Sequence, residues 1–241
     1  MRIVVSGTHA TGKSTLITDF VRQHSEFTVL PDPFELLDEA WDSPNPAMFT
    51  AQLRIAADRL VRDDEDECLI AERGPIDFLA YLLAMAELTG SSLSDDLIER
   101  ATTMSAVALR TVDLLVVLPL APSDPIHVGD EEYPELRDAM NDMLLDLIDD
   151  PDVIGTQLTV AEITGDPAAR LTALEALVGE HASRPTGEAR GNTGDVERQV
   201  ITREDEQVPP TIRRSRQPSG PVCAPSPRSR DLEWRDRSDL F

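Results

Sequence analysis

Positive charge is scarce in this 241-residue chain, and lysine is almost absent from it. The chain has 22 Lys and Arg residues against 45 Asp and Glu, for a net charge of −23, and Lys13 is its one lysine. Residues 1–180 hold 35 of the acidic residues but 11 of the basic ones. A domain this acidic repels polyanions, so we expect no nucleic-acid and no membrane partner for it. Any phosphate that it binds must be held by local geometry.

Cysteine and long apolar runs are lacking too. Cys68 and Cys223 lie far apart in the sequence and form neither a metal-ligand spacing nor a disulfide framework, which is typical of a cytoplasmic protein. No run approaches the roughly 18 apolar residues that a membrane span needs. Gly7 and Thr8 interrupt the apolar start before the core of a secretory signal can form. We therefore expect a cytoplasmic location.

Short apolar runs alternate with longer segments of helical periodicity along the first 180 residues. This alternation predicts an α/β fold in three layers, with a five-stranded parallel sheet covered by helices on both faces. The predicted strands are residues 2–6, 27–30, 67–72, 112–120 and 157–163, and the predicted helices are 13–24, 46–62, 75–88, 95–110 and 168–178. Between them, residues 121–150 begin with turn residues and end in an acidic helix, which suits a mobile flap.

The composition changes near residue 181. Pro, Ser, Gly and Arg dominate from there on, and apolar residues are too sparse to offset the entropy of ordering. We therefore predict a folded domain over residues 1–180 and a disordered tail over residues 181–241.

The stretch GTHATGKST, residues 7–15, follows the first predicted strand and opens the first predicted helix. It satisfies the phosphate-loop pattern G-x-x-x-x-G-K-[ST], in which small residues let N–H groups turn inward around a phosphate. Lys13 would reach the β- and γ-phosphate oxygens, and Ser14 would bind Mg²⁺. The alternative is a glycine-rich turn without a ligand. The residues expected to bind ATP are Gly7, Thr8, His9, Ala10, Thr11, Gly12, Lys13, Ser14 and Thr15.

Charged residues follow the predicted third strand. Ligands of parallel sheets bind beyond the carboxyl ends of the strands, so Glu72 and Arg73 should emerge beside the phosphate loop. A carboxylate there can hold Mg²⁺ or its water, and an arginine can neutralise phosphoryl oxygens. The alternative is an ion pair that ends a strand. Asp77 falls in the first turn of the next predicted helix. A carboxylate there interacts favourably with the helix dipole, and this is enough to explain the residue.

A second carboxylate, Asp32, follows the predicted second strand and stands between two prolines that fix its backbone. At a strand's carboxyl end it could accept a proton from a hydroxyl group. Flanking prolines are also typical of an ordinary turn, so the residue by itself leaves both interpretations open.

Together these features resemble the P-loop small-molecule kinases over about residues 1–180. The likeness is to deoxynucleoside kinases and to the group that includes nicotinamide riboside kinase domains, often described as generic AAA-type ATPase domains. It implies a P-loop NTPase fold in which Asp32 is the general base and Glu72 and Arg73 bind metal and phosphate. Gln52 and Arg59, seven residues apart on one predicted helix face, would correspond to residues that contact the nucleobase; a solvated helix face is the alternative.

The resemblance implies ATP-dependent phosphoryl transfer to a small hydroxyl compound, a nucleoside or nucleoside-like molecule. Lys13, Asp32, Glu72 and Arg73 would be catalytic, with ATP and Mg²⁺ as cofactors. The alternative is a regulatory NTPase or sensor without a small acceptor, which is favoured by a flap that supplies a single arginine, Arg137. The sequence leaves open the acceptor, ATP versus GTP, and monomer versus homodimer.

Overall fold

A parallel β-sheet forms the centre of the structure, a computed structural model that describes residues 1–36, 44–62, 68–90, 93–120, 133–183 and 198–201. All strands run in the same direction, in the order β2-β3-β1-β4-β5-β6. Their carboxyl ends therefore share one edge of the sheet. The strands are β1 (Arg2–Ser6), β2 (Thr28–Leu30), β3 (Leu69–Glu72), β4 (Leu114–Val117), β5 (Thr159–Ile163) and β6 (Arg198–Ile201).

The five predicted strands and their parallel arrangement are confirmed, whereas the sixth strand was not predicted. β6 pairs with β5 and lies inside the segment expected to be disordered from residue 181 onward. Its sequence, RQVI, has too few apolar residues to signal a strand, and an edge strand needs only backbone pairing. Residues 184–197 and 202–241 of that predicted tail lie outside the described residues.

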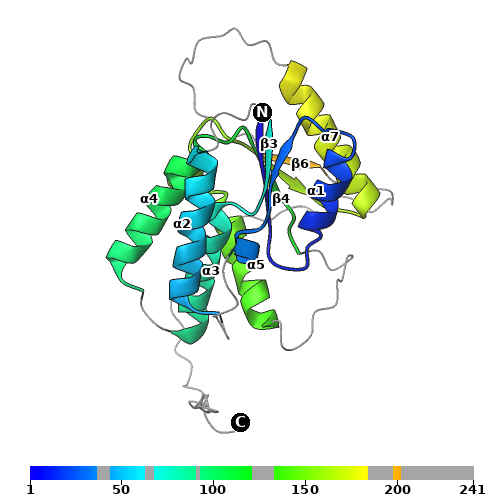
Figure 1. Cartoon of the computed structure of the whole chain (residues 1–241). Coiled ribbons are helices and arrows are strands. Elements are labelled where there is room, and N and C mark those ends of the chain that lie inside the picture. Colours follow the sequence, from blue (N-terminus) through cyan, green and yellow to red (C-terminus); the bar gives the residue numbers. More distant parts are fainter. Residues whose placement is uncertain (37–43, 63–67, 91–92, 121–132, 184–197, 202–241) are drawn as a thin grey trace, which may run out of the picture. The chain divides into compact units, whose positions relative to one another are not determined.

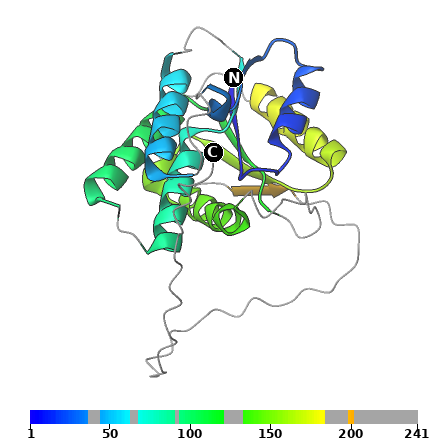
Figure 2. The ribbon, with the colours of Figure 1, turned by 60° about the horizontal axis from the view of Figure 1, so that its bottom comes forward.

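Helices cover both faces of the sheet (Figures 1 and 2). One face is covered by α1 (Lys13–Val21) and α7 (Pro167–Ser183), which pack on Ile3 and Val5. The other face, which includes Val4, is covered by the remaining α-helices. Apolar residues on alternate sides of β1 thus fill two separate cores, as a doubly covered parallel sheet requires. The helices of the second face are α2 (Pro46–Arg62), α3 (Pro75–Thr89), α4 (Asp95–Leu109), α5 (Pro134–Leu147) and α6 (Pro151–Ile154).

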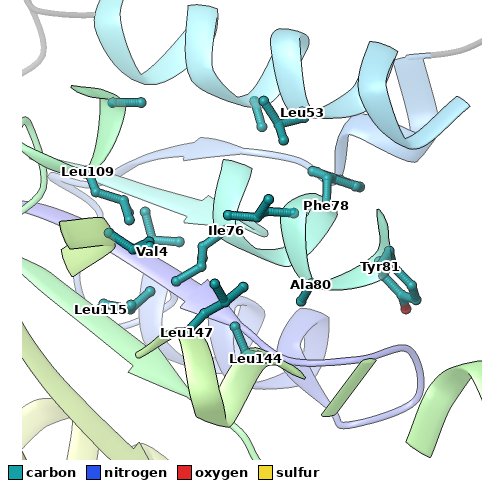
Figure 3. Packing of buried hydrophobic residues seen from close by; sticks show 14 of the residues in the cluster. Val4, Leu53, Ile76, Phe78, Ala80, Tyr81, Leu109, Leu115, Leu144 and Leu147 are labelled. Atoms are coloured by element: carbon teal, nitrogen blue, oxygen red, sulfur yellow. The ribbon is translucent and has the colours of Figure 1, made fainter. Parts of the chain in front are cut away.

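The acidic sequence of residues 121–150 predicts a mobile flap. The structure instead shows that the helix within it, α5, packs in the core. Leu136, Met140, Leu144 and Leu147 are buried on one stripe of the helix. Figure 3 shows Leu144 and Leu147 beside Ile76 of α3. Residues three and four apart lie on one helix face, so the acidic side chains take the opposite face. The rest of the predicted flap, residues 121–132, lies outside the described residues.

No helix in the described ranges is both long and apolar enough to cross a membrane.

Removing the side chain of Leu144 tests the role of α5 in the core. Leu144→Ala should lower the free energy of unfolding by about 2–5 kcal/mol, because it leaves a cavity between α5 and α3. The control is Leu88→Ala, because Leu88 of α3 is 48% exposed. This substitution should change the free energy of unfolding by less than about 0.5 kcal/mol. Urea unfolding measures both; equal effects would contradict the packing of α5.

Candidate active site

The predicted phosphate loop connects β1 to α1 and has the backbone geometry of a tight curl. Gly7, Ala10 and Gly12 have φ values of 149°, 53° and 85°. A Cβ on Gly7 would lie 2.8 Å from the Leu118 carbonyl oxygen and 2.9 Å from Thr11 Oγ1, so only glycine fits there. The loop ends at Gly12, which caps the N-terminus of α1. Its shape fits a nest for an anion at the head of a helix.

Lys13 is buried at the start of α1. Its Nζ donates a hydrogen bond to the Thr8 carbonyl oxygen at 2.7 Å, and the residue is 4% exposed. Burial, together with the positive charge of Arg73, lowers the pKa of Lys13 to about 7, against the opposing effect of Asp77. An anion beside the ammonium group would favour its charged form.

Ser14 and Glu72 bring two oxygen ligands together from separate elements. The Ser14 hydroxyl donates to Glu72 Oε1 at 2.7 Å, joining the first turn of α1 to the end of β3. The described residues contain no cluster of three or more His, Cys, Asp or Glu side chains that could hold a metal by itself. Two oxygen ligands suit Mg²⁺, which keeps several waters and shares a substrate's phosphates. The pair therefore fits the predicted metal site.

The buried Arg73 forms an ion pair with Asp32, which is partly exposed. Arg73 Nε donates to Asp32 Oδ2 at 2.7 Å, and the guanidinium lies 5.5 Å from the ring centres of both Phe34 and Tyr81. Burial by itself lowers the pKa of Arg73, but Tyr81, Asp32 and Asp77 outweigh it, so the pKa is raised. Arg73 is therefore a permanent cation. Its φ of 64°, rare for a residue other than glycine, turns the chain directly after Glu72.

A cavity of about 370 Å³ opens beside this ion pair. Its walls are largely aromatic, and the ring of Phe49 stacks on Tyr81 at a centroid distance of 4.7 Å. Such a cavity suits a flat, partly apolar molecule whose polar groups face a few fixed partners. The lining residues that matter here are Asp32, Phe34, Phe49, Arg73, Tyr81 and Tyr133.

The two residues expected to contact a nucleobase, Gln52 and Arg59, are not among the residues that line this cavity. Gln52 is fully buried one turn after Met48 and Phe49, which do line the cavity. Neither polar atom of its side-chain amide has a hydrogen-bond partner within the described part of the chain. Arg59 donates to the Pro31 carbonyl oxygen at 2.7 Å and so supports the turn that carries Asp32.

Asp77 has a larger role than the helix-dipole position that its sequence suggested. The Ser6 hydroxyl and the Gly74 N–H donate to Asp77 Oδ2 at 2.6 and 2.9 Å, and the Gly7 N–H donates to Oδ1 at 2.9 Å. Burial raises the pKa of Asp77, while Arg73 and these hydrogen bonds oppose the rise. One carboxyl group thus ties the end of β1 to the start of α3.

Tyr81 links the aromatic cavity to the phosphate loop, which sequence reasoning missed. Its hydroxyl lies 3.3 Å from Thr8 Oγ1 and 3.3 Å from both the backbone N and Nδ1 of His9. Tyr81 follows Asp77 by four residues, so both point from one face of α3 towards the loop. The four-residue spacing between Asp77 and Tyr81 was the sequence feature that could have indicated this contact.

Comparisons with known proteins identify the fold. No protein-family model matches the chain, and no curated protein does either. Among solved structures, a deoxyadenosine kinase from M. mycoides with dCMP and dCDP bound is similar at 13% identity, with a TM-score of 0.53 over 75% of this chain and 100% of that one. A thymidylate kinase from Candida albicans is similar at 16% identity, with a TM-score of 0.50 over 75% and 92%. The predicted P-loop kinase fold is confirmed.

Replacing Asp77 tests its role as the anchor of the loop. Asp77→Asn should lower the free energy of unfolding by about 1–3 kcal/mol, because an amide NH₂ group cannot accept the bonds that the carboxylate accepts from buried donors. Asp138→Asn, at an exposed aspartate of α5, is the control and should have little effect. Urea unfolding of both variants decides the point; equal stabilities would show that the buried bonds of Asp77 contribute nothing.

Proposed function

We propose that this protein transfers a phosphoryl group from ATP to a hydroxyl group of a small nucleoside-like acceptor. The observation that carries the proposal is the place of Asp32, whose carboxylate lines an aromatic cavity directly beside the phosphate loop. Arg73 connects the two regions, since it donates to Asp32 and, at 3.0 Å, to the carbonyl oxygen of Gly7. A hydroxyl group held in the cavity would therefore lie between a base and the end of the loop.

The donor side uses the loop, Lys13, Ser14 and Glu72. Loop N–H groups and the Lys13 ammonium would hold the β- and γ-phosphates of ATP, and the Ser14 and Glu72 oxygens would hold Mg²⁺. Bound Mg²⁺ would supply charge neutralisation on the phosphates. The main contribution of these residues is thus to fix the triphosphate in place before reaction.

On the acceptor side, Asp32 orients the hydroxyl group and takes its proton as the oxygen attacks the terminal phosphorus of ATP. The bond between that phosphorus and the bridging oxygen breaks, which leaves ADP and a phosphorylated acceptor. The Arg73 guanidinium keeps the Asp32 carboxylate in place and lies where it can stabilise charge on the transferring group.

The charge of the cavity favours an acceptor without a phosphate. Arg73 is the one Lys or Arg among the residues that line it, and that cation is already paired with Asp32 and lies 3.9 Å from Asp77. Of the segments outside the described ranges, those before residue 184 (residues 37–43, 63–67, 91–92 and 121–132) contain no Lys or Arg, and arginines occur only in the segments from residue 184 onward. A phosphate monoester needs a cation of its own in such a site. A nucleoside therefore fits better than a nucleoside monophosphate.

Gln52 supports a nucleobase as the flat part of the acceptor. An amide offers both a donor and an acceptor, which matches the edge of a base, and leaving both unpartnered in a core is costly. Gln52 lies one turn after the cavity-lining Met48 and Phe49 on α2, and the edge of a base would be the partner that its amide lacks.

ATP turnover with and without a panel of nucleosides and nucleoside monophosphates tests this function. Lys13→Ala should reduce ADP formation at least about 100-fold by removing a charge that holds the phosphates. Asp32→Asn should reduce it by about 10²–10⁴, because the base is lost while the contact to Arg73 can remain. Asp95→Asn, at an exposed aspartate of α4, is the control.

The same assay separates the two candidate functions. Turnover that needs a nucleoside and disappears in both active-site variants supports the kinase. Turnover that is independent of any acceptor and unchanged in Asp32→Asn would instead support the regulatory NTPase.

Gln52→Leu provides a second, independent test. The free energy of unfolding should rise by about 1–3 kcal/mol, since a buried group without partners is replaced by an apolar one of similar size. The KM for the acceptor should rise about tenfold or more, because the base loses its partner. Met48→Leu is the control for a change in the cavity wall. A stabilised variant with an unchanged acceptor KM would remove Gln52 from the substrate site.

A further inference from the structure

Every backbone carbonyl from Gly7 to Thr11 accepts a hydrogen bond from a cationic side chain. These bonds cover five consecutive residues of the phosphate loop. Arg73 donates to Gly7 O (3.0 Å), Lys13 to Thr8 O (2.7 Å), Arg137 to His9 O (3.1 Å) and Ala10 O (3.3 Å), and Arg170 to Thr11 O (2.6 Å).

The four cations, which we call the carbonyl collar, come from separate parts of the chain. Lys13 begins α1, Arg73 follows β3, Arg137 lies on α5 and Arg170 on the first turn of α7. Lys13, Arg73 and Arg170 are 4–5% exposed. The collar takes four of the 11 basic residues that the sequence has up to residue 180. Such a concentration in an acidic domain calls for a physical reason.

The reason lies in the geometry of a peptide that binds an anion. When the N–H groups of a loop turn towards a phosphate, the carbonyl groups of the same peptides turn away from it and need donors of their own. A cation behind each carbonyl satisfies it and also favours the orientation in which the peptide dipole presents its positive end to the phosphate. The collar thus acts on the phosphate through the backbone, in addition to the direct contacts proposed above for Lys13 and Arg73.

We infer that the collar is a positioning device, in which Arg137 and Arg170 hold the loop open for an anion and supply the positive potential that the acidic domain otherwise lacks. The inference rests on the proposed function, since the anion is the triphosphate of the nucleotide. It gives Arg137 and Arg170 a role in nucleotide affinity without direct contact to substrate. Two details agree with this role.

The first detail is the fit of Arg170 against the loop. A Cβ on Gly12 would lie 3.2 Å from Arg170 Nη1, so glycine at this position leaves room for the guanidinium as well as for the turn into α1. The second is the fork of Arg137, whose Nε and Nη2 serve two successive carbonyls. A planar guanidinium makes such paired contacts in a fixed geometry, which restricts the peptide planes of His9 and Ala10.

Charge and hydrogen bonding can be separated by replacing arginine with glutamine or lysine. Arg170→Gln and Arg137→Gln keep a donor but remove the charge, and each should weaken Mg-ATP binding about tenfold, the difference between a charged and a neutral hydrogen bond. Arg170→Lys keeps the charge and should stay within about threefold of the parent protein. Arg100→Gln, at an exposed arginine of α4, is the matched control.

Calorimetry on the full chain, with Mg-ATP and with inorganic tripolyphosphate as probes, gives the deciding measurement. Equal fold-losses for the two probes support the collar, because it acts on the phosphates and not on the base. Thermal unfolding without ligand identifies a variant that fails to fold. If Arg170→Gln does not fold, Arg137→Gln provides the test, because Arg137 is only partly buried and its replacement should disturb folding less.

The outcomes distinguish the collar from the function on which it rests. Glutamine variants that bind like Arg100→Gln would overturn the collar and leave the proposed kinase intact. An Arg170→Lys variant as weak as Arg170→Gln would overturn the role of charge. A parent protein that binds neither probe would overturn both proposals.

Discussion

The structure depends on one constraint: the outward-facing carbonyl groups of the predicted phosphate loop need hydrogen-bond donors. Residues 7–11 curl at the end of β1, and the carbonyls of that curl require donors that the loop cannot provide itself. The fold supplies them from α1, the turn after β3, α5 and α7, which are far apart in the sequence. The parallel sheet makes this possible because it gathers the ends of its strands at one edge.

The same edge concentrates groups that would be unfavourable elsewhere. Arg73 has a left-handed backbone, Asp77 is a fully buried carboxyl group, and Gln52 keeps a buried amide without partners in the described structure. Each of these costs stability by itself, and neighbouring contacts offset the cost for the first two. Groups of this kind gather where a protein binds and transforms a ligand, which agrees with the cavity beside Asp32.

Charge is used sparingly around the site. The chain has 22 basic residues against 45 acidic ones, so it has few cations to place around a nucleotide. The basic residues at the site instead contact the backbone of the loop, and Arg73 also pairs with Asp32, which lines the cavity. Basic side chains thus lie behind the loop, while the arginine that lines the cavity is paired with Asp32; under the proposed function, this difference would direct a triphosphate and an uncharged acceptor to their own places.

The sequence by itself determined the elements and the loop. Strand and helix periodicities and the pattern at Gly7, Gly12, Lys13 and Ser14 are local properties, so they needed no tertiary information. Tertiary structure alone decided that α5 belongs to the core, that β6 extends the sheet, and that Asp77, Tyr81, Arg137 and Arg170 meet the loop. Those contacts join residues up to 159 positions apart, and no local pattern records such a pairing.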